Sequence, residues 1–333
     1  MEKERGMQSL PPTSAQREFP QLQRLPFFSP ANQGLVADYL AHLRARHYAP
    51  ATEEGTIRAL KSFAVLLPEA RRTALYQDLT QTSPDDVDAW IEASFQQRLA
   101  PGTIATRLRV VQGFFAFLRD QGYVVQSPIR LPRHHILVPQ DLPRPMAEDE
   151  VVAFFRVIDA LRDRTMFLLM LRCGLRVGEV SRLRWSAIAL TQGTVRIENS
   201  KGHVDRVVYL SPDVATALRQ WHRLQVAPVL SVFPSRVTRR DGAPLTARQI
   251  RNRMARYLQL AGITKPYSPH SLRHTFATQL LNAGASLEVV KELMGHRSLD
   301  ITLRYTHLYD RTKRAQYDQA MAQVAKRQGL QER

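Results

Sequence analysis

Five prolines lie close together near the middle of this 333-residue chain and divide it into two parts. Proline has no backbone N–H and cannot continue a helix, so a segment this rich in proline favours an extended connector. The prolines fall within residues 126–145, where arginines and histidines are interspersed with them. A chain of this length is expected to form two domains of ordinary size. We therefore predict a basic linker over residues 126–145, with one domain on each side of it.

The part before the linker has the hydrophobic spacing of helices. Within residues 30–125, apolar side chains recur three and four residues apart in four stretches. One stretch starts at Ser83-Pro84-Asp85, where the serine suits an N-cap, the proline the first turn, and the carboxylate the positive end of the helix dipole. We predict a small all-helical domain over residues 30–125. Residues 1–29 carry four prolines and show no periodicity, which indicates a flexible N-terminal arm.

The part after the linker mixes helices with a pair of strands. Residues 194–197 and 206–210 alternate apolar and polar side chains on either side of a turn at residues 199–202. Helical spacing is found at residues 148–161, 164–173, 212–226, 246–261, 270–283 and 287–294, and beyond Tyr309. We predict a second domain over residues 146–333 that ends in a C-terminal helix. The fold class is therefore mainly α, with a small antiparallel β-hairpin or sheet in the second domain.

The net charge of +17 constrains the partners of the chain more than its fold. An excess of this size, with a sequence pI near 10.6, favours a polyanion such as nucleic acid. The sequence has no apolar stretch of about 18 residues to span a membrane and no signal-peptide core at its N-terminus. The single cysteine, Cys173, excludes an intramolecular disulfide. We expect a cytoplasmic protein that binds DNA or RNA, with its linker along a phosphate backbone.

Two short motifs contain arginines suited to a phosphate. Residues 173–179 have the sequence CGLRVGE and contain Arg176, and residues 270–274 have the sequence HSLRH and contain Arg273. A guanidinium presents paired donors that match phosphate oxygens, and it stays charged in any protein site. Two of them on one phosphate would neutralise its charge and stabilise the extra charge of a pentacoordinate transition state.

A tyrosine follows the second motif at a fixed distance. Tyr305, in the sequence RYTH, stands nine residues after His296, which follows a glycine. A phenol has a pKa near 10, so at neutral pH it needs a base or a dense positive field to act as a nucleophile. His270 lies three residues before Arg273, on the same side of a helix, and histidine titrates near neutrality. We predict a site that cuts DNA through a bond between Tyr305 and a phosphate.

These motifs resemble the two conserved boxes of the tyrosine recombinases, the phage-integrase and Xer family. The second box is nearly continuous over residues 270–307, and its spacing selects Tyr305 over Tyr309 as nucleophile. The resemblance implies a two-domain DNA clamp, in which residues 30–125 form the SAM-like core-binding domain and residues 146–333 the catalytic domain. It implies a 3′-phosphotyrosine intermediate and strand exchange through a Holliday junction. Neither ATP nor a metal is implied as cofactor, because the phosphotyrosine keeps the bond energy.

The resemblance also implies a role for each residue of the site. Lys201 would protonate the departing 5′ oxygen, the alternative being a turn lysine that only contacts phosphate. His270 would accept the tyrosine proton or donate to a phosphate oxygen. His296 would hydrogen-bond the scissile phosphate, the alternative being a buried structural histidine. Glu179 would orient Arg176, the alternative being a surface salt bridge.

The implied partners are double-stranded DNA with a specific recombination site, three further copies of the chain in a homotetramer, and an accessory DNA-bending or directionality protein. Residues 312–327 would dock on a neighbouring protomer or pack on their own domain. The arginine-rich composition favours integration and excision of a mobile element in the bacterial cytoplasm, associated with the nucleoid. Resolution of replicon or chromosome dimers is the alternative. A type IB topoisomerase and a catalytically silent DNA-binding regulator are two further alternatives.

Overall fold

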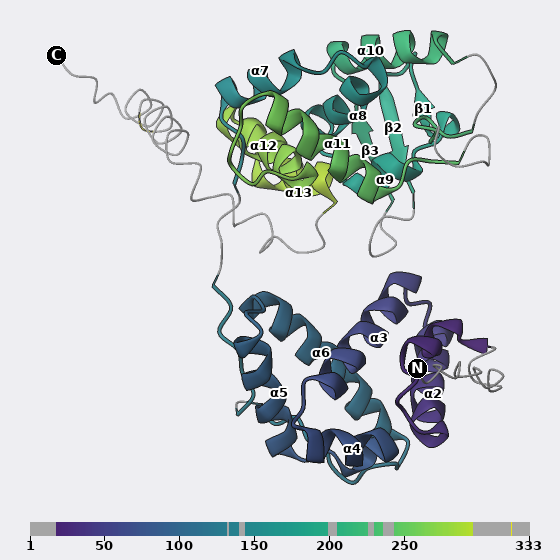
Figure 1. The fold of residues 1–333 in the computed structure, drawn as a ribbon. Helices are drawn as coiled ribbons and strands as arrows, with labels where there is room; N and C mark the ends of the chain where they lie inside the picture. The colour runs from purple at the N-terminus through teal and green to yellow at the C-terminus, as the bar shows by residue number, and fades with distance from the viewer. Residues whose placement is uncertain are drawn as a thin grey trace, which may run out of the picture. The chain divides into compact units, whose positions relative to one another are not determined.

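The computed structural model describes residues 18–131, 133–139, 144–198, 205–225, 230–235, 243–295 and Met321. The chain divides into two compact units, Met1–Gln140 and Asp141–Arg333, each of which has its own hydrophobic core. In both units the described elements are mostly helices, and one small sheet lies in the second unit (Figure 1). The predicted fold class is confirmed. Within the described residues no helix combines the length and apolar composition needed to cross a bilayer.

The first unit is all-helical over its described residues. Its elements are η1 (Pro20–Arg24), α2 (Pro30–Ala45), α3 (Pro50–Val65), α4 (Glu69–Gln77), η2 (Leu79–Gln81), α5 (Pro84–Gln96) and α6 (Pro101–Asp120). The predicted start of α5 is confirmed, because Ser83 is its N-cap and exchanges hydrogen bonds with Asp86 in a capping box. The short helix α4 was not predicted, since it buries only Leu75 and has little periodicity.

The prediction of a flexible arm over residues 1–29 is wrong for residues 18–29. Phe19, Leu22, Leu25 and Phe28 are all buried in the core of the first unit, and η1 lies among them. These four side chains recur every third residue, the period of a 3-10 helix rather than of an α-helix. Their spacing does not match the α-helical period, so the sequence pattern did not predict this segment. Residues 1–17 lie outside the described residues.

The first half of the predicted linker packs on the first unit. Ile129 and His134 are buried there, and the guanidinium of Arg133 donates to the carboxylates of Asp85 and Asp88 on α5. The charge of Arg133 is therefore balanced within its own unit, although we expected the linker charges to lie along a phosphate backbone. The bounds of the linker, residues 126–145, stay a prediction.

The second unit has helices around a small antiparallel sheet. Its elements are α7 (Glu148–Arg156), α8 (Leu161–Arg172), α9 (Val177–Arg182), η3 (Trp185–Ala187), β1 (Ile188–Ala189), β2 (Thr194–Ile197), β3 (Arg206–Tyr209), α10 (Pro212–Arg223), α11 (Ala247–Leu260), α12 (Pro269–Asn282) and α13 (Leu287–Met294). The strands are ordered β1-β2-β3, and β2 pairs with β3 from Thr194↔Tyr209 to Ile197↔Arg206. The predicted strand pair is confirmed. Of the predicted C-terminal helix the structure describes only Met321, which is helical.

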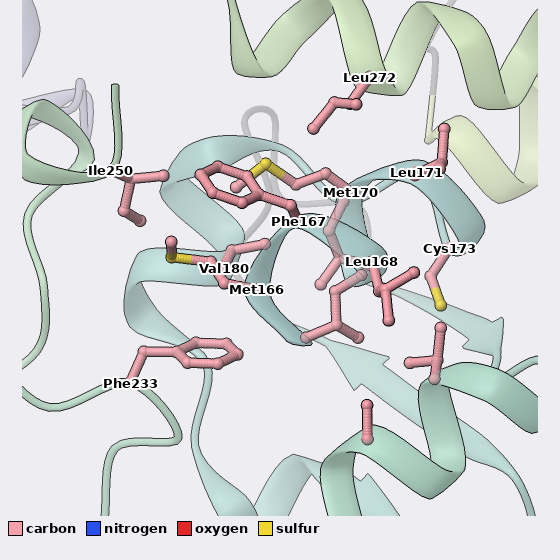
Figure 2. Packing of buried hydrophobic residues seen from close by; sticks show 14 of the residues in the cluster. Met166, Phe167, Leu168, Met170, Leu171, Cys173, Val180, Phe233, Ile250 and Leu272 are labelled. Atoms are coloured by element: carbon pink, nitrogen blue, oxygen red, sulfur yellow. The ribbon is translucent and has the colours of Figure 1, made fainter. Parts of the chain in front are cut away.

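Helix α8 forms the centre of the second core. All six residues from Met166 to Leu171 are buried, as expected of a helical segment that is apolar on every side. Figure 2 shows α8 residues among Val180, Phe233, Ile250 and Leu272, which come from four other segments. α8 packs against α12, and its C-terminal end leads directly to Gly174. This packing brings the two arginine motifs, which are far apart in the sequence, to the same region of the unit.

Candidate active site

Arg176 stands at the start of α9, where Glu179 fixes its position. One carboxylate oxygen of Glu179 accepts from the backbone N–H of Arg176 at 2.8 Å, and the other accepts from Nη1 of its guanidinium at 2.9 Å. A carboxylate three residues into a helix commonly reaches back to the N-cap in this way. The contact supports the predicted role of Glu179 as the residue that orients Arg176.

Glu179 also binds a second arginine that the sequence did not reveal. Arg206, on β3, donates from Nη1 and Nη2 to the two carboxylate oxygens of Glu179 at 2.9 and 2.7 Å. Both side chains are buried, which excludes the alternative of a surface salt bridge for Glu179. Burial alone would raise the pKa of Glu179, but Arg206 and then Arg176 lower it to about 2. The carboxylate is therefore charged at neutral pH.

The charge of Glu179 predicts how the stability of the folded protein depends on pH. The pKa of Glu179 is lower in the folded protein, so its contribution is present above pH 4.5 and lost as the pH falls toward 2. Glu179→Gln is expected to be less stable than the wild type at pH 6, by on the order of 3 kcal/mol, and the difference should shrink toward pH 2. Urea unfolding at several pH values measures this. Glu198→Gln, which changes an exposed carboxylate, is the control. If the stability difference between Glu179→Gln and the wild type did not shrink at low pH, the lowered pKa of Glu179 would be contradicted.

Arg273 is almost completely enclosed, with 1% of its surface exposed. Its Nη1 donates to the carbonyl of Gly174 and its Nη2 to the carbonyl of Met294. Gly174 has φ +64°, and a Cβ at this position would lie 2.5 Å from the ring of Phe276. Only glycine fits there, so Gly174 of the first motif leaves room for Phe276 while its carbonyl accepts from the arginine of the second motif.

Three arginines meet the C-terminal end of α13. Arg206 Nε donates to Leu293 O at 2.8 Å, Arg273 Nη2 to Met294 O, and Arg176 Nη2 to Gly295 O at 3.0 Å. The last carbonyls of a helix have no partner within it and carry the negative end of its dipole, so they suit cationic donors. We call Arg176, Arg206 and Arg273 the arginine triad. Through the triad, both predicted motifs and β3 are connected to one turn of backbone.

His270 lies on the first turn of α12, three residues before Arg273. It keeps contact with solvent, but partial burial, followed by the charges of Arg273 and Arg176, lowers its pKa. The ring of His274 meets the ring of His270 edge-on, with 4.5 Å between centroids. Burial, His270 and Arg273 lower the pKa of His274 to about 4. A neutral His270 at neutral pH has the state required to accept a proton.

The remaining predicted residues, Lys201, His296 and Tyr305, lie outside the described residues. The structure therefore brings together Arg176, Glu179 and Arg273, with His270 on the same helix turn as Arg273. Among the described residues no group of three or more histidine, cysteine or carboxylate side chains is arranged to hold a metal ion.

Comparison with known proteins decides the family. The model of the phage integrase family matches residues 144–312, and the model of its N-terminal SAM-like domain matches residues 36–122. The chain belongs to the phage integrase family. Members of this family are tyrosine recombinases, so the chain is an enzyme of the class that breaks and rejoins DNA strands in site-specific recombination.

Curated relatives of the family include proteins with two kinds of name. The chain is 33% identical to tyrosine recombinase XerC of Xylella fastidiosa over 67% of its own length and 75% of the relative. It is 33% identical to tyrosine recombinase XerD of Pseudomonas putida over 75% of its own length and 81% of the relative. It is also 33% identical to a putative integrase/recombinase, y4qK, of Sinorhizobium fredii, over 64% and 67% of the two chains.

Solved structures of family members have the same fold. The integrase of transposon Tn1549, in complex with transposon right end DNA, matches with a TM-score of 0.66 at 17% identity, over 85% of this chain and 99% of that one. A lambda integrase tetramer bound to a Holliday junction matches with a TM-score of 0.65 at 18% identity, over 82% of this chain and 76% of that one. At identities of 17% and 18%, the likeness shows that this chain shares the fold of these two integrases.

Proposed function

We propose that this recombinase cuts each DNA strand with Tyr305 and that Arg176, Lys201, His270, Arg273 and His296 complete its catalytic site. The observation that carries the proposal is the convergence of Arg176 and Arg273, which are 97 positions apart, on the successive carbonyls of Met294 and Gly295. The next residue along the chain is His296, and Tyr305 follows nine residues later.

In the proposed mechanism Arg176 and Arg273 neutralise the scissile phosphate, and His296 hydrogen-bonds one of its oxygens. The Tyr305 oxygen forms a bond to phosphorus while His270 takes the phenol proton. The bond from phosphorus to the 5′ oxygen breaks, and Lys201 gives that oxygen a proton. Attack by the 5′ hydroxyl of a second duplex reverses these steps and exchanges the strands. The phosphotyrosine conserves the energy of the broken bond, so the reaction needs neither ATP nor a metal.

The proposed partners are duplex DNA with a specific recombination site and three further copies of the chain. The net charge of +17 supports a DNA partner. The tetramer is supported by a structure of lambda integrase, in which a tetramer of that protein is bound to a Holliday junction. We further propose that the protein acts in the bacterial cytoplasm at the nucleoid, with an accessory DNA-bending or directionality protein.

For the biological role we propose integration and excision of a mobile element, which the transposon and phage integrases of the same fold support. The relatives named XerC and XerD favour a second candidate, which is the resolution of replicon or chromosome dimers. The two roles use the same chemistry and differ in the DNA site.

Strand exchange between two labelled duplexes tests this function. In the presence of EDTA, the protein is expected to join strands of duplexes that carry the ends of its own element and to give a junction intermediate. Exchange at a chromosomal site instead would support dimer resolution. Relaxation of supercoiled DNA without any preferred site would indicate a type IB topoisomerase. Specific binding without a cut strand would indicate a silent regulator and contradict the proposal.

A further inference from the structure

Arg206 has contacts that are unusual for a strand residue. Its side chain is 4% exposed and occupies an inward position of β3, where Val208 also points to the core. An arginine at such a position must have its charge balanced inside the protein. It uses three nitrogens for this: Nη1 and Nη2 bind Glu179, and Nε binds the carbonyl of Leu293.

The C-terminal end of α13 leaves room for the side chain of Arg206. Gly295 has φ +59°, and a Cβ there would lie 3.0 Å from Cδ and 3.1 Å from Nη1 of Arg206. A larger residue would therefore push Arg206 away from Glu179 or from Leu293. Glycine at the C-cap of α13 therefore leaves the space that Arg206 needs to contact both Glu179 and Leu293.

Arg206 consequently joins three segments that the proposed reaction requires. Glu179, which it binds, holds the backbone and the guanidinium of Arg176. Leu293, which it also binds, lies three residues before His296, and Arg206 itself lies five residues after Lys201. One buried side chain is thus linked by contact or by short chain segments to three residues of the proposed site.

We propose that Arg206 is a positioning residue for recombination: it shares the charge of Glu179 with Arg176 and fixes the end of α13, so that the phosphate-binding arginines are placed before DNA arrives. This inference rests on the proposed function. Among the described residues, Arg176 and Arg206 are the arginines that bind Glu179. Without Arg206, Arg176 is drawn toward the carboxylate and away from the phosphate. Lysine does not replace Arg206, because a single ammonium cannot bind both carboxylate oxygens and a carbonyl in fixed geometry.

Cleavage kinetics on nicked duplex DNA test the positioning role. Arg206→Lys and Arg206→Gln are expected to lower the cleavage rate constant at saturating DNA by about 100-fold, with the dissociation constant for DNA little changed. The matched control is Arg172→Gln, which removes the same charge from an exposed pair with Asp213 and should keep the wild-type rate. A variant of Arg206 that keeps its thermal midpoint and cleaves at the wild-type rate would overturn the inference.

A double-mutant cycle tests whether Arg206 acts through Glu179. If it does, Arg206→Gln combined with Glu179→Gln lowers the rate no further than the more harmful single change, because the two residues act as one unit. Losses that multiply would mean that Arg206 works independently of Glu179, which would overturn the proposed route.

Hydrogen exchange tests the placement of α13 without any need for activity. In Arg206→Lys, the amides at the C-terminal turn of α13 are expected to exchange about tenfold faster than in the wild type, while those of α2 in the other unit are unchanged. Unchanged exchange at α13 would overturn the inference. A wild-type protein that never cuts DNA would refute the proposed function, but this measurement would still decide whether Arg206 fixes the end of α13.

Discussion

Tyr305→Phe is expected to abolish strand cleavage while the variant still binds its DNA site. Phenylalanine keeps the shape of the ring but has no oxygen to bond to phosphorus. Removal of the nucleophile from an enzyme with a covalent intermediate typically lowers the rate by roughly 10⁴-fold or more. The measurement is the amount of covalent protein–DNA adduct on a denaturing gel, beside a filter-binding or gel-shift measurement of DNA affinity.

Tyr309→Phe is the matched control for this change. It removes the same hydroxyl four residues further along the chain, and it should leave adduct formation intact. An adduct that persists in Tyr305→Phe and disappears in Tyr309→Phe would show that the spacing of the motif identified the wrong tyrosine.

Arg273→Lys is expected to lower the cleavage rate by about 10³-fold, the loss typical of a donor that stabilises transition-state charge. Arg273 is buried and donates from two nitrogens to the carbonyls of Gly174 and Met294, so its guanidinium is fixed before substrate binds. Lysine keeps the charge but has neither the planar fork nor the reach to both carbonyls. Single-turnover cleavage of a nicked duplex measures the rate.

The control for Arg273→Lys is Arg219→Lys, an equivalent change at an exposed position on α10. A thermal melt separates loss of folding from loss of chemistry, because Arg273 also contributes hydrogen bonds to the core. A folded Arg273→Lys protein with a rate near that of the wild type would remove Arg273 from the catalytic site.

Local sequence signals predicted much of the fold. The Ser83-Pro84 start of α5 and the strands on either side of residues 199–202 follow from capping and alternation, which act between near neighbours. The segment from Phe19 to Phe28 was mistaken for an arm, because its apolar side chains have the period of a 3-10 helix. Helix α9 was missed because its six residues are too few for a periodic pattern.

Part of the candidate site was also predictable from local motifs, and part of it depends on tertiary packing. Arg176, Glu179 and Arg273 were predicted from motifs, and the structure brings them together. Arg206 was not predicted, although an arginine at an inward strand position is a signal that a buried carboxylate is near. That the arginine triad is held by the end of α13 depends on how α8, α12 and α13 pack, which no short motif encodes.

Covalent trapping on nicked duplex DNA tests the central claim most directly. A nick beside the cut lets the short 5′-hydroxyl fragment diffuse away, so the adduct accumulates. Proteolysis and mass spectrometry then identify the attached residue. We predict an adduct that forms in EDTA and joins Tyr305 to a DNA 3′-phosphate. No adduct in the presence of tight, salt-sensitive DNA binding, or an adduct on any other residue, would contradict the assignment of this chain as a recombinase that acts through Tyr305.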